Sequence, residues 1–112
     1  MRLRIDTTQV KFRVAGMPKA RPDFRDKSKQ ATTPDGRPIW SVRLTAIDTG
    51  AGSTETIWVE VTGQQPELVL DEVATVAGLV FSPWVSKRGE IMRSFRADEI
   101  TQGGGTARGR AA

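Results

Sequence analysis

Two tryptophans in this chain have neighbours that would suit the binding of a nucleic acid. Trp84 follows Pro83 at the end of an apolar run, and Lys87 and Arg88 come soon after it in "PWVSKRGE". Trp58 lies in "TETIWVEV", where the residues of its own parity are polar. Exposed rings beside cations favour base stacking combined with phosphate contacts. The function therefore depends on whether the surrounding elements leave these rings exposed.

Composition argues against catalysis. The chain has no histidine and no cysteine, so the commonest general base and the commonest metal ligands are missing. Its carboxylates are spread over predicted strands and connections without metal-ligand spacing, and "TGAGST" lacks the Lys-Ser/Thr of a phosphate-binding loop. We expect a protein that is not an enzyme and that uses no metal and no other cofactor.

The positive charge is concentrated at one end of the chain. Residues 1–43 hold eleven Lys and Arg against four acids, whereas residues 44–99 hold four against nine, and the whole chain carries +4. A polyanion is one partner that such a segment would attract. The alternative is that these Lys and Arg side chains only face water and keep the protein soluble.

Length and hydropathy favour one small soluble domain. The chain has 112 residues, a size that suits a single core. The segment "MRLRIDTTQVKFRV" alternates and lacks the apolar stretch of a signal peptide, and no apolar run is long enough to span a bilayer. We expect a cytoplasmic protein that does not contact membranes.

Alternation predicts a first strand at about residues 7–16. Phe12 belongs to the apolar parity, and Lys11 and Arg13 belong to the polar parity. The two cations should therefore lie on the outer side of this strand, where phosphates could reach them.

A predicted hairpin follows, with strands in "IWSVRLTAID" and "TETIWVEVTG" and a turn at residues 49–53. Trp58 takes the outward parity of the second strand, either to bind a ligand or to be covered by a loop or another subunit. Two registers fit the inward parities: one pairs Arg43 with Glu60, and the other places Arg43 beside Trp58, where a cation–π contact is possible. Arg43 lies on the candidate face in both. Trp40 has core parity, so burial or packing at a barrel end is favoured there.

The remaining elements complete a plan of five strands. A short helix is expected at residues 64–72, and a fourth strand at 73–84 should bend or bulge at Gly78. A turn at 86–90 leads to a fifth strand at 91–100. Five strands with a small helix between the third and fourth predict an all-β OB-fold barrel over residues 1–100. The Gly/Arg-rich residues 101–112 are predicted to form a disordered basic tail.

A long basic segment separates the first two strands. Residues 17–38 hold four prolines and no apolar period, which predicts a long, mobile loop. Arg21, Phe24 and Arg25 lie in it, and such a loop could fold over a bound strand. Disorder of the loop is the competing interpretation.

From Thr54 onward the chain resembles the bacterial single-stranded DNA-binding proteins. The resemblance rests on "TETIWVEV", on "LDEVATVAGLV" with the Val73, Val76 and Gly78 spacing, and on Trp84 in the loop that follows. It covers about half of the chain. It implies an OB fold, and the short connection and basic tail look more like the compact forms carried by plasmids, integrative elements and phages.

Residues and resemblance together predict single-stranded DNA binding with little sequence preference, in the replication or transfer of a mobile element. The predicted binding residues are Trp58, Trp84, Arg43, Lys87, Arg88, Arg21, Phe24, Arg25, Lys11 and Arg13. Packing of Trp84 over a barrel end is the alternative for that ring. A protein–protein or homo-oligomerisation module, and an RNA-binding OB module, are the alternative functions.

Overall fold

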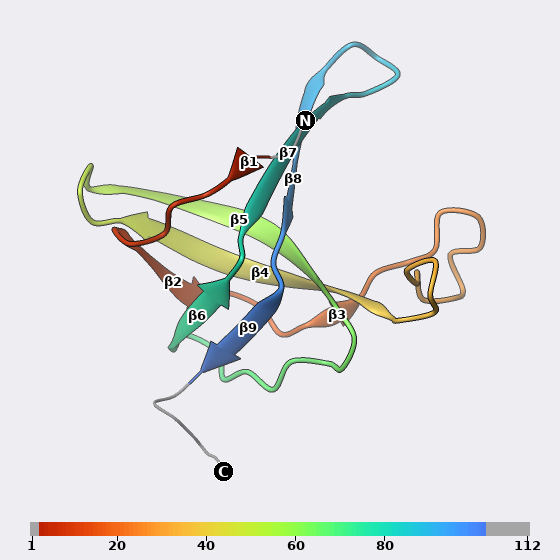
Figure 1. Cartoon of the computed structure of the whole chain (residues 1–112), viewed down its shortest axis with the longest axis horizontal. Helices are drawn as coiled ribbons and strands as arrows, with labels where there is room; N and C mark the ends of the chain where they lie inside the picture. The colour runs from red at the N-terminus through yellow and green to blue at the C-terminus, as the bar shows by residue number, and fades with distance from the viewer. Residues whose placement is uncertain (1–2, 103–112) are drawn as a thin grey trace.

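The computed structural model describes residues 3–102, and this part of the chain is all-β (Figure 1). The all-β class predicted from alternation is therefore confirmed. No helix occurs in residues 3–102, and consequently none that could cross a membrane. The strands are β1 (Leu3–Arg4), β2 (Val10–Val14), β3 (Lys19–Ala20), β4 (Ile39–Asp48), β5 (Ser53–Thr62), β6 (Val73–Ala77), β7 (Val80–Val85), β8 (Ile91–Arg96) and β9 (Glu99–Gln102).

The long hairpin β4–β5 is the centre of the sheet. Its strands pair antiparallel over their whole length, and Gly52 takes a positive φ of 73° at the turn. The Asp48 carboxylate accepts hydrogen bonds from the backbone N–H groups of Gly50 and Ala51, which stabilises this turn. The predicted hairpin is confirmed.

β2 lies on the other side of β4 and shows the alternation that the sequence predicts. Phe12 and Val14 are buried, whereas Lys11 and Arg13 are exposed. The strand is shorter than predicted, because the chain forms a turn at residues 8–9 and leaves the sheet after Val14.

The predicted fourth strand is divided by a bend at Gly78, which has a φ of +67°. Before the bend, β6 pairs with β2 and β9; after it, β7 pairs with β1 and β8. The predicted fifth strand is divided in the same way into β8 and β9. The bend predicted at Gly78 is confirmed. Because of it, the hairpin of residues 73–102 contributes β6 and β9 beside β2, and β7 and β8 beside β5.

The sheet curls around its core because one bent chain segment supplies a strand near each end: β7 lies next to the edge strand β1, and β6 lies next to the edge strand β9. β8 runs parallel to β5, with Val59 beside Phe95, and β7 follows β8 in the strand order. β6, separated from β7 by two residues, returns to β2. The inner side holds the core: Phe12, Val14, Val42, Leu44, Ile57, Val59, Val61, Leu68, Ala74, Val76, Leu79, Ala97 and Ile100. Phe95 is partly buried and packs against this core.

The helix expected at residues 64–72 is absent. Leu68 is buried while the next two residues are exposed. The segment therefore contacts the core through Leu68 and does not present an apolar helical face. Asp71 has a left-handed φ of +68°, and its N–H donates to Val14 O at 2.8 Å. Backbone bonds to the neighbouring strand therefore replace the bonds that a helical turn would make.

The segment at residues 17–38 has more structure than the sequence predicts. β3 pairs with β4, and isolated bridges join Pro22 to Gln30 and Thr32 to Pro38. The expectation of a loop without secondary structure is thus wrong for its first residues. Thr101 and Gln102, assigned to the predicted tail, belong to β9, and the rest of that tail lies outside the described residues.

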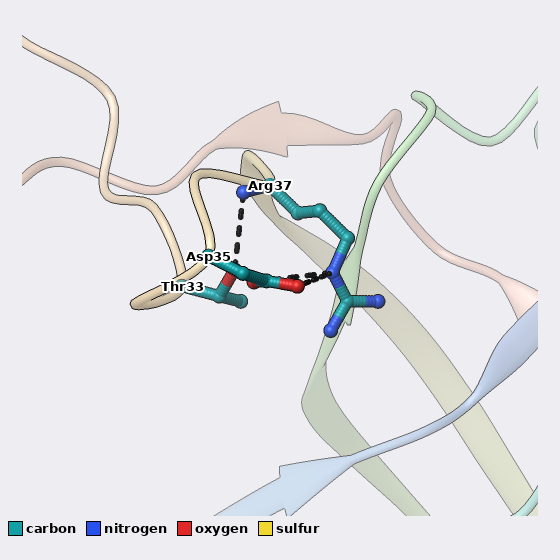
Figure 2. A network of polar contacts seen from close by, with 3 residues as sticks. All are labelled: Thr33, Asp35 and Arg37. Atoms are coloured by element: carbon teal, nitrogen blue, oxygen red, sulfur yellow. Dashed lines mark hydrogen bonds and ion pairs between the residues drawn. The ribbon is translucent and has the colours of Figure 1, made fainter.

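A polar network closes the turn at the end of this segment (Figure 2). The Thr33 hydroxyl donates to the Asp35 carboxylate and accepts a bond of 3.0 Å from the backbone N–H of Arg37. Asp35 also forms an ion pair of 3.1 Å with Arg37 Nε. The Thr33 hydroxyl first, and Arg37 to a smaller extent, hold the pKa of Asp35 below its ordinary value.

Candidate nucleic-acid interface

The outer face is the side of β2, β4, β5, β7 and β8 that points away from the core. Residues paired across strands share a face, so the register assigns each side chain to the inside or the outside. Among the predicted site residues, the strands bring five to this face: Lys11, Arg13, Arg43, Trp58 and Trp84.

Arg43 and Trp58 lie directly opposite each other on β4 and β5. The Arg43 Cζ is 5.8 Å from the centroid of the Trp58 ring, and the ring remains 48% exposed. The second of the two registers that fit the sequence is therefore the correct one. The pair combines a cation with a ring whose accessible surface could stack on a base.

Two residues that the sequence analysis missed hold Arg43 in place. Its Nη2 donates to Ala15 O at 3.0 Å, and a β-carbon at Gly16 would lie 3.3 Å from its Nε. The N–H groups of Ala15 and Gly16 both donate to Arg43 O. The guanidinium thus lies against a glycine backbone, and the small residues in "VAG" are the sequence signal for this close approach.

Trp84 lies on the β7–β8 hairpin, opposite Met92, and is 49% exposed. Pro83 does not interrupt the strand: it pairs with Arg93, and β7 continues to Val85, one residue beyond the predicted fourth strand. β1 covers β7 only at Val80 and Phe81, so beyond them β7 is an edge strand, where proline is tolerated.

The turn predicted at residues 86–90 is present and carries exposed cations. Ser86 N–H donates to Glu90 O at 2.8 Å, and Gly89 has a φ of +81°. Lys87 and Arg88 are exposed at this tip, which projects from the rest of the sheet (Figure 1). The hairpin therefore carries an exposed ring on β7 and two exposed cations at its tip.

Of the predicted site residues in the basic segment, Arg21 lies on the outer face. Arg21 Nη1 lies 3.3 Å from each carboxylate oxygen of Glu60 on β5. Phe24, 90% exposed, and Arg25 lie farther along, in turns. Figure 1 shows the chain between β3 and β4 extending on a different side of the molecule from the β7–β8 tip.

Arg13 is partly engaged with the protein itself. Its Nη1 donates to Asp71 O at 3.0 Å. Lys11, two residues earlier on the same face of β2, is exposed. Arg96 is a cation that the sequence analysis missed: it lies opposite Glu60 in the parallel pairing of β5 and β8. No local pattern signals that pairing, because 28 residues (63–90) separate the two strands in the chain.

Trp40 has a structural role. It is partly buried against the core, and its Nε1–H donates to Gly63 O at 2.9 Å. The prediction that this ring packs against the core is confirmed.

Three aspartates have lowered pKa values, and all three lie in turns away from the outer face. The backbone N–H of Thr8 lowers the pKa of Asp6, and the Ser28 hydroxyl lowers that of Asp26; the Thr33 hydroxyl does so for Asp35. Each shift comes mainly from a hydrogen bond between near neighbours in the chain, which stabilises the local turn. In residues 3–102, no group of three or more His, Cys, Asp or Glu could hold a metal ion.

No protein-family model, no curated protein and no solved structure matches this chain. The resemblance to single-stranded DNA-binding proteins therefore stays a prediction, and the functional argument depends on the outer face.

Proposed function

We propose that this protein is an OB-fold domain that binds single-stranded DNA on its outer face, without catalysis. The strand order supports this fold. With residues 73–85 and 91–102 each counted as one bent strand, the pairing runs from β2 through β4, β5 and β8 to β7, and β6 returns to β2. Counted in this way, the curled sheet is compatible with a five-stranded barrel that is partly open, as in OB folds.

The observation that carries the proposal is the half-exposed Trp58 ring beside Arg43. In OB folds the face of the second and third strands binds oligonucleotides, and here those strands are β4 and β5. Trp84 extends the same face onto the hairpin, where Lys87 and Arg88 add cations. Each stacked base would contribute about 1–3 kcal/mol.

The phosphate contacts make the proposed binding depend on salt and only weakly on sequence. Each phosphate neutralised on a single strand lowers the slope of log K against log salt by about 0.7. Such a protein would protect single strands during the replication or transfer of a mobile element, in the cytoplasm.

The test is a titration of tryptophan fluorescence with oligo-dT, oligo-U and a DNA duplex at two salt concentrations. Quenching by oligo-dT that weakens at the higher salt supports the proposal. Stronger quenching by oligo-U would instead favour an RNA-binding module, and the absence of quenching by all three would contradict nucleic-acid binding.

A second function, homo-oligomerisation, is favoured by the apolar side of the hairpin opposite Trp84. Val85 and Ile91 pair there and are 67% and 79% exposed. Such a patch suits a protein contact. Sedimentation measurements would distinguish the two functions, because a stable oligomer that does not quench with DNA contradicts the first and supports the second.

A further inference from the structure

Glu60 is the one outward carboxylate on β2, β4, β5, β7 and β8 as the structure describes them. The other outward residues of these strands are cationic, hydroxyl-bearing or apolar. A negative charge on a face that attracts phosphates weakens phosphate binding. Its place beside Trp58 therefore calls for a role of its own.

One cation, Arg21, holds the Glu60 carboxylate in position. Arg21 Nη1 lies 3.3 Å from both of its oxygens, and Arg96 lies opposite it on β8. The side chain is 27% exposed. An ionised carboxylate has about four acceptor sites, and no second side-chain donor to it occurs in residues 3–102. Acceptor capacity therefore remains on the outer face.

Glu60 lies two residues from Trp58 on the same face of β5, about 7 Å along the strand. Arg43 occupies one side of the Trp58 ring. A base that stacks on the accessible surface of the ring therefore brings its edge within reach of the carboxylate. Cytosine presents an amino donor there, whereas thymine presents a carbonyl acceptor that the carboxylate repels; carboxylates accept from cytosine N4 in duplex recognition as well.

From this geometry we infer that Glu60 selects bases that carry an exocyclic amino group, cytosine above all, over thymine and uracil at the Trp58 position. The inference rests on the proposed function and adds selectivity at one position to an otherwise unselective surface. Arg21 then acts as the positioning residue that orients the carboxylate.

The test is a competition between oligo-dC and oligo-dT of equal length at neutral pH and fixed salt. Wild-type protein should prefer oligo-dC by about tenfold, the effect of one hydrogen bond to a charged acceptor. In Glu60→Gln the ratio should fall towards one. Affinity for oligo-dT should rise because a negative charge is removed, and this retained binding also shows that the variant is folded.

Glu55→Gln is the matched control. Glu55 lies on the same strand but takes the opposite parity and pairs with Arg93, so this variant should keep the wild-type ratio. Equal affinities in wild-type protein, or an unchanged ratio in Glu60→Gln, would overturn the inference while both oligonucleotides still bind. Failure of both oligonucleotides to bind would instead overturn the proposed function.

Discussion

Gly16 lies against the side chain of Arg43, and a β-carbon at position 16 would stand 3.3 Å from Arg43 Nε. The same guanidinium donates to Ala15 O and faces the Trp58 ring. The backbone before Gly16 thus orients a cation on the proposed binding face, although it contacts no ligand itself.

Gly16→Ala should weaken DNA binding about two- to fivefold without unfolding the protein. The added methyl group displaces the guanidinium from the ring, and an exposed cation–π contact is worth about 0.5–1 kcal/mol. The φ of Gly16 is not in the left-handed region, so alanine causes no backbone strain there. Fluorescence titration and circular dichroism measure the two effects.

The double variant with Arg43→Ala provides the control. If Gly16 acts through Arg43, adding Gly16→Ala to Arg43→Ala should not change affinity further. Additive losses would show that Gly16 affects binding by another route.

Trp58→Ala and Trp84→Ala should each lower affinity by about 5- to 150-fold, which corresponds to 1–3 kcal/mol of stacking per base. Both rings are about half exposed, so urea unfolding should change little. A large loss of stability in either variant would mean that the ring supports the fold instead.

Trp40→Phe should have the opposite profile. This ring packs on the core and donates to Gly63 O, and a lost hydrogen bond of this kind costs about 1 kcal/mol. We expect a lower urea midpoint with unchanged DNA affinity of the folded protein. A loss of affinity at full stability would place Trp40 in the binding surface.

In this chain the alternation of apolar and polar residues predicts which side of a strand a side chain occupies, but it does not predict which residues of two strands lie opposite each other. Because the side-chain period of a strand is two, the outward parity of Trp58 and the inward parity of Val59 follow from the local sequence. Both registers of β4 and β5 kept the inward residues inside, so only the folded chain distinguishes them. The contact between Arg43 and Trp58 could be considered from the sequence but not chosen.

Features that depend on backbone bonds between distant segments had no local signal. β3 has two residues and is defined by its pairing with β4, as when Ala20 lies opposite Trp40. The parallel neighbours Glu60 and Arg96 come from strands that the sequence places far apart. The predicted helix failed for the same reason, because Asp71 bonds to Val14 O instead of completing a helical turn.

The pH dependence of stability should include a contribution from Asp35. Since its folded pKa is lowered, mainly by the Thr33 hydroxyl, the ionised form stabilises the fold above the unfolded pKa. That stabilisation is lost as pH falls through the lowered folded pKa. Asp35→Asn should therefore lower the thermal midpoint at neutral pH, and the difference from wild type should shrink in acid. A difference that does not change with pH would contradict this origin.

Gly78→Ala should destabilise the protein more than Gly89→Ala. Both glycines have a positive φ, +67° and +81°, and alanine in that region costs about 1–2 kcal/mol. A β-carbon at Gly89 meets nothing within 4 Å, whereas one at Gly78 collides with the Asp98 side chain. In urea unfolding, Gly89→Ala should therefore report the backbone strain alone, and Gly78→Ala should report the strain together with crowding at the bend between β6 and β7. In an Asp98→Ala background the carboxylate is gone and only the β-carbon of residue 98 remains, 3.2 Å away, so the cost of Gly78→Ala should fall towards that of Gly89→Ala. If the two costs are equal without that background, Asp98 moves aside freely and the bend requires glycine for its φ alone.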